Sequence, residues 1–321
     1  MKRRHFLAGT IALPTAAHAQ ARSDGKKIGY VYVGPQSNTA SRLGIILAGV
    51  RASGQTLSKE DVVFRATEGD PAKLAPTVKD VLAQSVTAFI AGGPAALRAA
   101  LQLTKTLPIL AYDFESDPVA EKYVQSVSRP GGNVSGVFLD MPGFAGKWIE
   151  LLRECMPQLI RVALIWDPAT GRLQADAVTK AAESLGLKTD LLEVRGPADY
   201  APAFATARGR GAQAVVLLSS PMVFIQVKAL GELAARERMP AITMFGEFAK
   251  GGGMLGYGPS LFGAFKQASF MAGKVLGGAS VATLPIERPS IYELVVNQRS
   301  AEMLGVKIPA SVQARADEVI E

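Results

Sequence analysis

The most constraining feature of the sequence is a repeated alternation of short β-branched runs with segments of helical spacing. Eight strand-like runs rich in Val, Ile, Leu and aromatic residues follow Lys26. They are KIGYVYV (27–33), DVVFRAT (61–67), TAFIAG (87–92), LPILAYD (107–113), RVALIWD (161–167), KTDLLEV (188–194), AQAVVLLSS (212–220) and MPAITMF (239–245). Continuous apolar strands that alternate with helices are typical of parallel sheets covered on both faces. The sequence therefore predicts an α/β fold with parallel sheets.

The eight steps form two halves of similar plan, and 321 residues exceed what one hydrophobic core usually serves. Residues 126–143 are rich in Gly, Pro, Ser and Asn and indicate a passage between two lobes. The Gly-rich segment 249–260 indicates a second passage, and the late strand YELVVN (292–297) indicates a third. We predict two Rossmann-like lobes joined by three hinge crossings. The first lobe contains residues 26–139 and about 252–280, and the second contains residues 140–251 and about 281–321.

The N-terminal stretch MKRRHFLAGTIALPTAAHAQ has the layout of a secretory signal peptide. A basic end precedes a short apolar stretch, and the small-residue pattern AHA stands before Gln20. Arg3 and Arg4 resemble a twin-arginine signal, but the segment is short for one, so Sec export stays equally open. We predict a signal peptide over residues 1–19, cleavage near Ala19 and a periplasmic protein.

Cleavage would leave a chain without histidine, because His5 and His18 are the only two. That excludes Ser-His-Asp and Cys-His catalysis and most zinc sites. We therefore predict no catalytic residue, no metal and no cofactor. The lone Cys155 forbids an internal disulfide and lies in an apolar helical pattern, where we expect a buried structural thiol.

The positive charge of the sequence is partly a property of its leader. The formal net charge of +7 falls to +4 when Lys2, Arg3 and Arg4 leave with the signal. The remaining basic residues are scattered, without a Lys/Arg block or a basic strip interleaved with aromatic residues. This distribution predicts no nucleic-acid binding.

The segment after the third strand has the composition of an anion site. In AGGPAAL (91–97) the chain turns into a helix that begins at Pro94 and Ala95. Gly93 permits a close approach of the backbone to a ligand, and free N–H groups at a helix start favour an anion such as a carboxylate. A simple turn between strand and helix is the alternative.

Three alternate carboxylates, Asp113, Glu115 and Asp117, follow the fourth strand. A calcium loop is excluded, because the sixth and twelfth positions counted from Asp113 are Pro118 and Val124 instead of Gly and Glu. We expect Asp113 or Asp117 to accept a cation of the ligand, while the others cap a turn or the next helix. The alternative is that all three are solvated or capping.

Further candidates lie after the first strand and in the second half of the chain. The loop VGPQSNTA (33–40) is polar, and the seventh strand ends with two hydroxyls in SSP (219–221). Turn formation and helix capping are the alternatives for Ser220 and Asp167. The predicted ligand-binding residues are Gln36, Ser37, Gly93, Pro94, Ala95, Asp113, Asp117, Asp140, Asp167, Ser220, Glu247 and Tyr257.

Several stretches resemble the substrate-binding protein family of ABC transporters that includes tryptophan- and tyrosine-linked uptake proteins. They are GGPAAL, SDPV followed by SRPGGNVSG, RVALIWDP, GGGMLGYGPS and YELVVNQRSAEMLGVKIP, in order and at family spacing. The resemblance implies a type I periplasmic-binding-protein fold whose cleft closes on a small solute, with an ABC permease and ATPase as partners. It also puts Gly93, Pro94, Asp117, Pro118 and Asp167 at the cleft.

Together these features predict a monomeric periplasmic receptor for an amino acid, aromatic in some relatives, or for a similarly small amino- or carboxyl-bearing compound. An exported α/β hydrolase is the first alternative, although the mature chain lacks histidine and an activated cysteine. A ligand-sensing periplasmic receptor is equally compatible with the sequence. A sugar-sensing transcription regulator would need an N-terminal helix-turn-helix, where the signal peptide stands.

Overall fold

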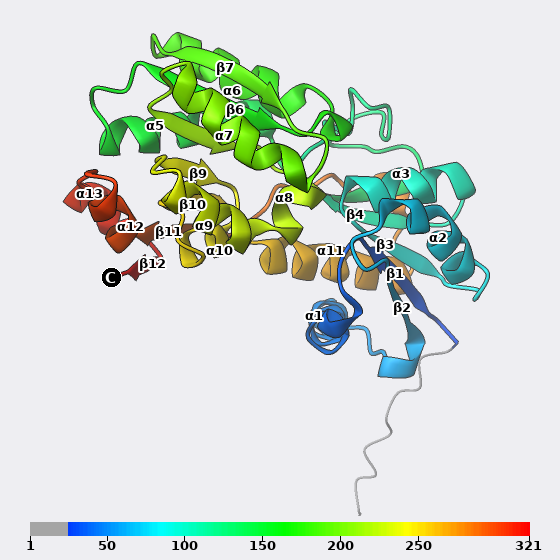
Figure 1. The fold of residues 1–321 in the computed structure, drawn as a ribbon. Coiled ribbons are helices and arrows are strands. Elements are labelled where there is room, and N and C mark those ends of the chain that lie inside the picture. Colours follow the sequence, from blue (N-terminus) through cyan, green and yellow to red (C-terminus); the bar gives the residue numbers. More distant parts are fainter. Residues whose placement is uncertain (1–24) are drawn as a thin grey trace, which may run out of the picture.

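The computed structural model describes residues 25–321, which form two β-sheets side by side, each flanked by helices (Figure 1). The first sheet has five parallel strands in the order β2-β1-β3-β4-β5. Its strands are β1 (Ile28–Tyr32), β2 (Val62–Ala66), β3 (Ala88–Gly92), β4 (Ile109–Asp113) and β5 (Val134–Phe138). The four strands predicted in the first half of the chain, and their parallel arrangement, are confirmed.

The second sheet has seven strands in the order β12-β11-β10-β9-β8-β6-β7. Its strands are β6 (Arg161–Trp166), β7 (Lys188–Glu193), β8 (Ala214–Leu217), β9 (Ala241–Thr243), β10 (Leu255–Pro259), β11 (Tyr292–Asn297) and β12 (Glu318–Ile320). All neighbouring strands run parallel except the antiparallel pair β10 and β11. The predicted α/β fold with two parallel-rich sheets is therefore confirmed.

The helices lie between the strands along the chain and cover both sheets (Figure 1). They are α1 (Thr39–Ala52), α2 (Leu74–Leu82), α3 (Pro94–Leu103), α4 (Met141–Phe144), α5 (Gly146–Cys155), α6 (Leu173–Ser184), α7 (Tyr200–Gly209), α8 (Pro221–Ile225), α9 (Val227–Arg236), α10 (Gly246–Lys250), α11 (Leu261–Leu276), α12 (Gln298–Met303) and α13 (Ala310–Gln313). Cys155, at the end of α5, is buried as a free thiol, as its apolar surroundings predict.

The alternation of side chains along β1 decides which helices cover each face of the first sheet. Tyr30 and Tyr32 belong to the hydrophobic cluster that contains Ile46 of α1 and Phe265 of α11. Val31, between the two tyrosines, belongs to a second cluster with residues of α2 and α3. Because successive side chains of a strand point to opposite faces, α1 and α11 cover one face and α2 and α3 cover the other.

The chain crosses between the lobes three times: after β5, after β10 and before β11 (Figure 1). β10 pairs with β9 and β11 of the second sheet, whereas α11 packs against α1 and against β3, β4 and β5 of the first lobe. The second crossing therefore lies at Ser260 rather than at about residue 252. The chain returns after Glu287, whose main chain bonds to Gly136 and Phe138 of β5, rather than at about residue 281.

The sequence does not predict strands β5, β10 and β12. In β5 the segment VSGVF contains Gly136, which has φ of +141° and on which a Cβ would collide with the backbone of Ala111 in β4. Glycine is therefore required for β4 and β5 to pair at this point. The same Gly- and Ser-rich composition predicts a crossing instead of a strand, which explains the difference.

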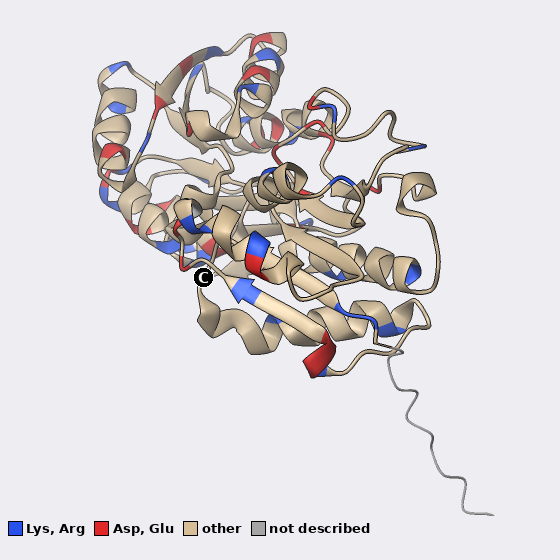
Figure 2. Cartoon of the chain, turned by 90° about the vertical axis from the view of Figure 1, so that its right-hand side faces the viewer, with Lys and Arg blue, Asp and Glu red and all other residues tan. Residues whose placement is uncertain are grey.

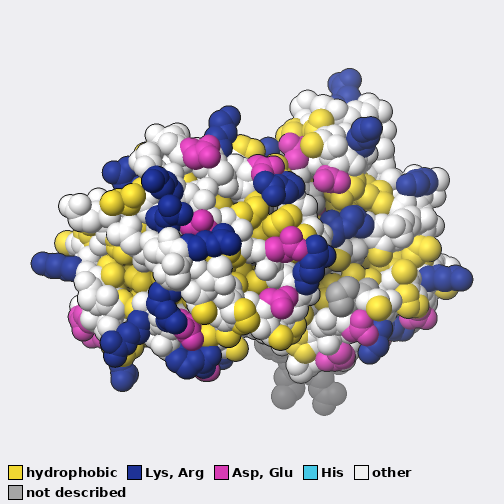
Figure 3. All heavy atoms as spheres, turned by 45° about the horizontal axis from the view of Figure 1, so that its top comes forward, with side chains coloured by type: hydrophobic (Ala, Val, Ile, Leu, Met, Phe, Trp, Pro, Cys, Tyr) yellow, Lys and Arg dark blue, Asp and Glu magenta, His cyan; other side chains and the backbone are white. Residues whose placement is uncertain are grey.

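The predicted signal peptide lies outside the described residues. Within residues 25–321, no helix is both long and apolar enough to cross a membrane. On the faces drawn in Figure 2 and Figure 3, Lys and Arg are interspersed with Asp and Glu. The scattered basic residues of the sequence thus give a mixed surface on these faces rather than a broad field of one sign.

Candidate functional site

A pocket between the two lobes brings together the loops that follow the parallel strands. Residues at or just after the ends of β1, β3 and β4 line it from the first lobe. Residues after β8 and β9 line it from the second lobe, and Leu261 at the start of α11 lies at the hinge. The carboxyl ends of parallel strands are where open α/β lobes bind their ligands, so this pocket is the candidate functional site.

The buried Arg42 of α1 contributes a cation to the pocket. Arg42 is 2% exposed, and its Nη1 donates hydrogen bonds to Oη of Tyr30 (2.7 Å) and Oη of Tyr112 (3.3 Å). Its guanidinium carbon lies 3.9 Å from the ring centroid of Tyr32, which is a cation–π contact. Within residues 25–321 no carboxylate pairs with Arg42, and its Nε has no hydrogen-bond partner.

The tyrosines around Arg42 do not neutralise its charge. Burial, followed by the influence of Tyr112, raises the pKa of the Tyr30 hydroxyl well above its usual value of 10. Both Tyr30 and Tyr32 are therefore neutral near pH 7, since burial also raises the pKa of Tyr32. A buried cation with only neutral partners is costly, and its charge is available to an anion that enters the pocket.

Glu115 is a second buried ionisable group in the pocket. It is 7% exposed, and its Oε1 accepts a hydrogen bond from Oγ of Ser219 (3.1 Å), which belongs to the second lobe. The other carboxylate oxygen, Oε2, is buried and has no hydrogen-bond partner. The loop is shaped by Asp113, whose Oδ1 accepts from the backbone N–H groups of Glu115 (2.8 Å) and Ser116 (3.0 Å).

The surroundings of these two carboxyl groups favour their neutral forms. Burial, and next the nearby Asp113, raise the pKa of Glu115 well above its usual range, while the hydrogen bond from Ser219 acts in the opposite direction. Burial likewise raises the pKa of Asp113, against the effect of its backbone hydrogen bonds. A cation that approached Glu115 would reverse this preference, because opposite charge stabilises the carboxylate.

The second lobe supplies hydroxyl groups that are held in fixed positions. Gln174 of α6 is buried, and its amide accepts from the backbone N–H of Ser219 (3.0 Å) and donates to the Ser219 carbonyl (2.8 Å). Ser220 is the N-cap of α8, where its Oγ accepts from the backbone N–H of Val223 (3.1 Å). Both serines line the pocket.

The start of α3 faces the same pocket from the first lobe. Gly93 is its N-cap with φ of +93°, a conformation that favours glycine, and Pro94 is the first helical residue. Gly93, Pro94 and Ala95 all line the pocket. The ten-residue helix directs its first N–H groups and the positive end of its dipole to this side.

Aromatic rings form the apolar walls between these polar groups. Tyr32, Tyr112 and Phe114 line the pocket from the first lobe, and Phe224 and Phe245 line it from the second. The rings of Phe224 and Phe245 meet edge to face, with centroids 5.2 Å apart. The pocket thus combines an apolar interior with a few charged and polar groups, which is the usual composition of small-molecule sites.

The structure brings only some of the predicted ligand-binding residues together. Gly93, Pro94, Ala95 and Ser220 line the pocket. Gln36 and Ser37 do not: they are exposed in the short 3₁₀ turn Gln36–Asn38, where the Gln36 N–H donates to Oε1 of Glu68 (2.7 Å). Gln36, in the polar loop after β1, therefore bonds to the loop after β2 instead of facing the pocket.

The predicted aspartates hold the backbone rather than line the pocket. Asp113 is buried and does not line the pocket, and it accepts the two backbone hydrogen bonds described above. Asp117 accepts from the N–H groups of Val119 (2.8 Å) and Ala120 (3.1 Å), and Asp167 accepts from that of Ala169 (2.9 Å). Asp140 is exposed at the N-terminus of α4. For Asp113, Asp117 and Asp167, the interpretation as turn and helix caps fits their contacts better than direct ligand binding. The Asp140 side chain makes no capping hydrogen bond.

Glu247 and Tyr257 line two other grooves. Glu247 lines a hollow next to the pocket, behind Phe224 and Phe245. Tyr257 lines a groove of the second lobe with Lys147, Glu150, Glu154 and Arg315.

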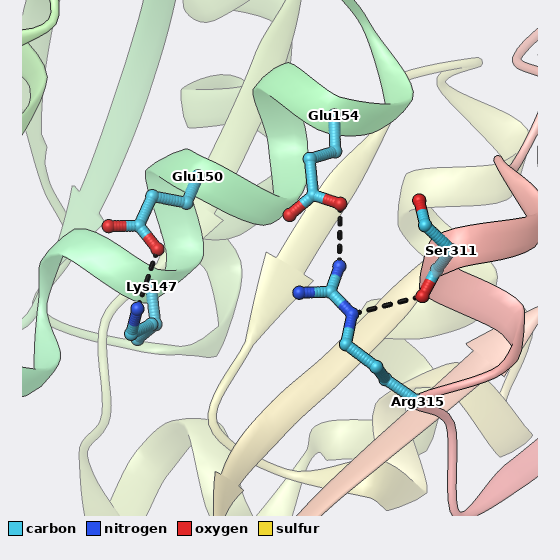
Figure 4. A network of polar contacts seen from close by, with 5 residues as sticks. All are labelled: Lys147, Glu150, Glu154, Ser311 and Arg315. Atoms are coloured by element: carbon cyan, nitrogen blue, oxygen red, sulfur yellow. Dashed lines mark hydrogen bonds and ion pairs between the residues drawn. The ribbon is translucent and has the colours of Figure 1, made fainter.

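The charged groups in the Tyr257 groove pair with one another, as Figure 4 shows. Arg315 Nη2 lies 2.6 Å from Glu154 Oε2, and Lys147 Nζ lies 2.8 Å from Glu150 Oε2. The four charges compensate one another in two pairs, so this groove offers a ligand less than the pocket between the lobes does.

Sequence reasoning missed Arg42, Tyr32 and Tyr112 as parts of the site. Arg42 stands in the helical pattern TASRLGIILAGV, where a basic residue is expected to be exposed to solvent. It is buried only because the folded structure places it above β1. The signal that was available is its position one helical turn after the polar loop that follows β1. The sequence shows Glu115 as one of three alternate carboxylates, but it does not show the contact of Glu115 with Ser219, 104 residues away.

The described residues contain no group of three or more His, Cys, Asp or Glu side chains placed to hold a metal ion.

Comparison with known proteins agrees with this fold. The chain matches the family model "ABC transporter substrate binding protein" over residues 30–320. A crystal structure of an ABC domain in complex with L-Trp from Streptococcus pneumonia has a TM-score of 0.80 and 22% identity, and the match covers 92% of this chain and 99% of that chain. A conserved domain protein from Vibrio cholerae has a TM-score of 0.81 and 20% identity, with the same coverage of both chains.

A curated relative is the tyrosine-binding protein of Clostridioides difficile (strain R20291), which is 21% identical over 214 residues. That match spans 65% of this chain and 60% of the relative's length. The two-lobed arrangement is that of type I periplasmic binding proteins, as the sequence predicts. Since the family model covers nearly the whole described chain, the protein belongs to the ABC transporter substrate binding protein family.

Proposed function

We propose that this chain is the periplasmic receptor that delivers a small solute, an amino acid or a similar compound with amino and carboxyl groups, to an ABC importer. Members of this family bind a small solute and work with an ABC transporter. The finer assignment rests on one observation. The buried guanidinium of Arg42 lines the pocket between the lobes with only neutral hydroxyls and rings as partners.

A carboxylate is the solute group that best answers this arrangement. Arginine binds carboxylates through paired, charge-assisted hydrogen bonds, and a carboxylate would supply the negative charge that Arg42 lacks. The start of α3, at Gly93 and Pro94, adds N–H groups and a positive dipole end on the same pocket. Both features favour an anionic group at the first-lobe side.

The rings of the pocket favour an apolar or aromatic side chain on the solute. Tyr32, Tyr112, Phe114, Phe224 and Phe245 surround the space with five aromatic rings. Aromatic pairs gain about 0.5–1.5 kcal/mol beyond their buried area when they stack or meet edge to face. The L-Trp complex and the tyrosine-binding protein among the similar proteins are consistent with an aromatic amino acid, and we infer that solutes of this class bind best.

A thermal-shift panel tests the proposal on the mature protein. The panel contains the twenty amino acids, short peptides and simple organic anions, each at millimolar concentration. A ligand at one hundred times its Kd stabilises the native state by about 2.7 kcal/mol, so a true solute raises the melting temperature clearly. The proposal predicts the largest rise with Phe, Tyr or Trp, and a panel in which no compound raises the melting temperature rejects it.

We also infer that the receptor is exported by the Sec or twin-arginine route, loses residues 1–19 and works as a monomer. The leader-like sequence of the first residues supports export. Intact-mass measurement of protein recovered from the periplasm tests cleavage after Ala19, and native mass spectrometry tests the monomer. A precursor mass in the periplasm, or a stable dimer at micromolar concentration, would contradict these inferences.

A further inference from the structure

The unpaired oxygen of Glu115 points to a second recognition group in the pocket. Its Oε2 is buried without a hydrogen-bond partner, while Oε1 accepts from Ser219 across the lobes. No Lys or Arg of residues 25–321 forms an ion pair with Glu115. A buried carboxyl oxygen that lines a pocket and has no partner is costly, unless a ligand supplies a donor.

The charged groups around Glu115 add to its attraction for a cation. Asp113 lies in the same loop and Asp167 belongs to the second lobe, and each of them, when ionised, raises the pKa of Glu115 and attracts a cation. Arg98 of α3 opposes them, but its side chain is exposed and it forms no ion pair with Glu115. The remaining contact, Ser219, is a neutral hydroxyl. The local field therefore favours a positive group over a neutral one.

The geometry can satisfy an ammonium group from both lobes at once. An ammonium has three N–H donors and no acceptor. Oε2 of Glu115 can accept from it on the first-lobe side, and the lone pairs of the Ser219 hydroxyl can accept on the second-lobe side. Gln174 fixes the backbone of Ser219 with two hydrogen bonds, so this acceptor is held in place.

We propose that Glu115 and Ser219 together form the receptor for a cationic group of the solute, and that this group holds the two lobes closed. The inference rests on the proposed function, because it divides the same solute between two sites: its anion at Arg42 and the start of α3, its cation at Glu115. When the cation binds, a protonated Glu115 releases its proton to solvent. The resulting carboxylate accepts a charge-assisted hydrogen bond from the solute. The solute class is thereby narrowed to compounds that carry both charges.

Matched probes that differ in one charge test this proposal. One set is L-phenylalanine, 3-phenylpropionate and 2-phenylethylamine, and the other is L-leucine, 4-methylpentanoate and 3-methylbutylamine. Isothermal titration measures the affinity of the wild type and of Glu115→Gln for each probe at pH 7. We expect Glu115→Gln to weaken the amine-bearing probes at least about tenfold, since a hydrogen bond to a charged group contributes about 1.5–3 kcal/mol. The two acids should change less than about twofold.

Two controls separate this role from a structural one. Asp117→Asn removes a carboxylate two residues away that does not line the pocket, and it should leave every probe unchanged. Ser219→Ala keeps Glu115 and removes its partner in the second lobe. In small-angle scattering, L-phenylalanine should reduce the radius of gyration of the wild type and of Asp117→Asn, and should do so less in Ser219→Ala and Glu115→Gln.

The outcomes divide clearly between the two proposals. Equal loss of affinity for acids and amines in Glu115→Gln overturns the cation receptor. Acids that bind as tightly as the amino acids also overturn it, and the proposed function then stands with an anionic solute. If none of the six probes nor any compound of the wider panel binds the wild type, both proposals fall together. A melting temperature within a few degrees of the wild type shows that each variant is folded.

Discussion

The two lobes contribute different chemistry to the pocket. The first lobe supplies the ionisable groups, Arg42 and Glu115, together with the start of α3. The second lobe supplies neutral groups, namely the hydroxyls of Ser219 and Ser220 and aromatic rings.

This difference assigns separate roles to the two lobes in binding a solute. Charged groups that are buried in one lobe already lie among the neutral partners that fix their geometry, so a solute finds preorganised partners there. The second-lobe residues that line the pocket are neutral, so none of them has a charge to desolvate when the lobe closes over the solute. We expect substitutions in the first lobe to alter which solutes bind, and substitutions in the second lobe to alter how firmly the lobes close.

The largest effect on solute affinity is expected when the cation of the first lobe, Arg42, is removed. Arg42→Leu should weaken L-phenylalanine binding by about 100-fold, since truncating one partner of a buried charge pair costs about 2–5 kcal/mol. Isothermal titration measures the loss. The fold should persist, because the hydroxyls of Tyr30 and Tyr112 lie 2.9 Å apart and bond to each other without the guanidinium.

The matched control for that variant is Arg51→Leu. Arg51 is an exposed arginine near the end of the same helix, outside the pocket. It should bind L-phenylalanine like the wild type. Equal affinity of Arg42→Leu and wild type would contradict the assignment of the anion to Arg42.

The carboxyl group of Glu115 should make the stability of the protein depend on pH. The pKa of Glu115 is raised in the folded protein, so its stabilising contribution is full below the ordinary carboxyl range and is lost as pH rises through the folded-state pKa. Gln does not ionise, so the Glu115→Gln variant does not lose this stability as pH rises. Its melting temperature, relative to the wild type without solute, should therefore increase between pH 4 and pH 8.

Calorimetric scans of both proteins across that pH range provide the measurement. Asp113, whose pKa is also raised by burial, stays in both proteins. Because it interacts with Glu115, the difference reports the titration of Glu115 together with its coupling to Asp113. A difference in melting temperature that is constant with pH would show that Glu115 titrates normally.

A smaller effect is expected from the second lobe. Ser220→Ala removes the N-cap of α8 and should lower the free energy of unfolding by about 1 kcal/mol, as for other caps. Ligand affinity should fall only a few-fold, equally for acids and amines. Urea unfolding and titration measure the two effects, and Ser220→Thr, which keeps a capping hydroxyl, should recover most of the stability. A change in the preference between acids and amines would contradict the division between the lobes.

The smallest effect is expected at Asp117. Its carboxylate accepts two backbone hydrogen bonds of its own loop and does not line the pocket. Asp117→Asn keeps an oxygen for these bonds and should leave affinity for L-phenylalanine within about twofold. A large loss of binding would return Asp117 to the role that the family resemblance assigns to it.

The sequence predicts the fold well because its signals are local. Strands such as β1 and β8 are continuous apolar runs, and the helix at Pro94 starts with a recognisable turn at Gly93. The observed crossing at Ser260 differs from the predicted one at about residue 252 because β10 is Gly-rich and forms a strand only by pairing with β9 and with the later strand β11. Local composition does not specify such pairing.

The site was predicted only in part for the same reason. Ser220 and the start of α3 lie directly at strand ends, where the topology alone places them. The role of Arg42 depends on Tyr112, 70 residues away, and that of Glu115 depends on Ser219, 104 residues away. Asp117 and Asp167 have the residue types of a binding site, but their carboxylate oxygens accept hydrogen bonds from nearby backbone N–H groups instead.

The place of α11 in the first lobe has a consequence for how the protein matures. Phe265 of this helix stacks on Tyr30, with centroids 4.8 Å apart, and lies beside Arg42, yet it is synthesised after strands β6 to β10 of the second lobe. The first lobe therefore cannot finish folding in order of synthesis, because the face of its sheet that α1 and α11 share stays partly uncovered until residues 261–276 arrive. Strands of the second lobe are therefore synthesised before the first lobe is complete. The pocket between the lobes is among the last parts of the molecule to form.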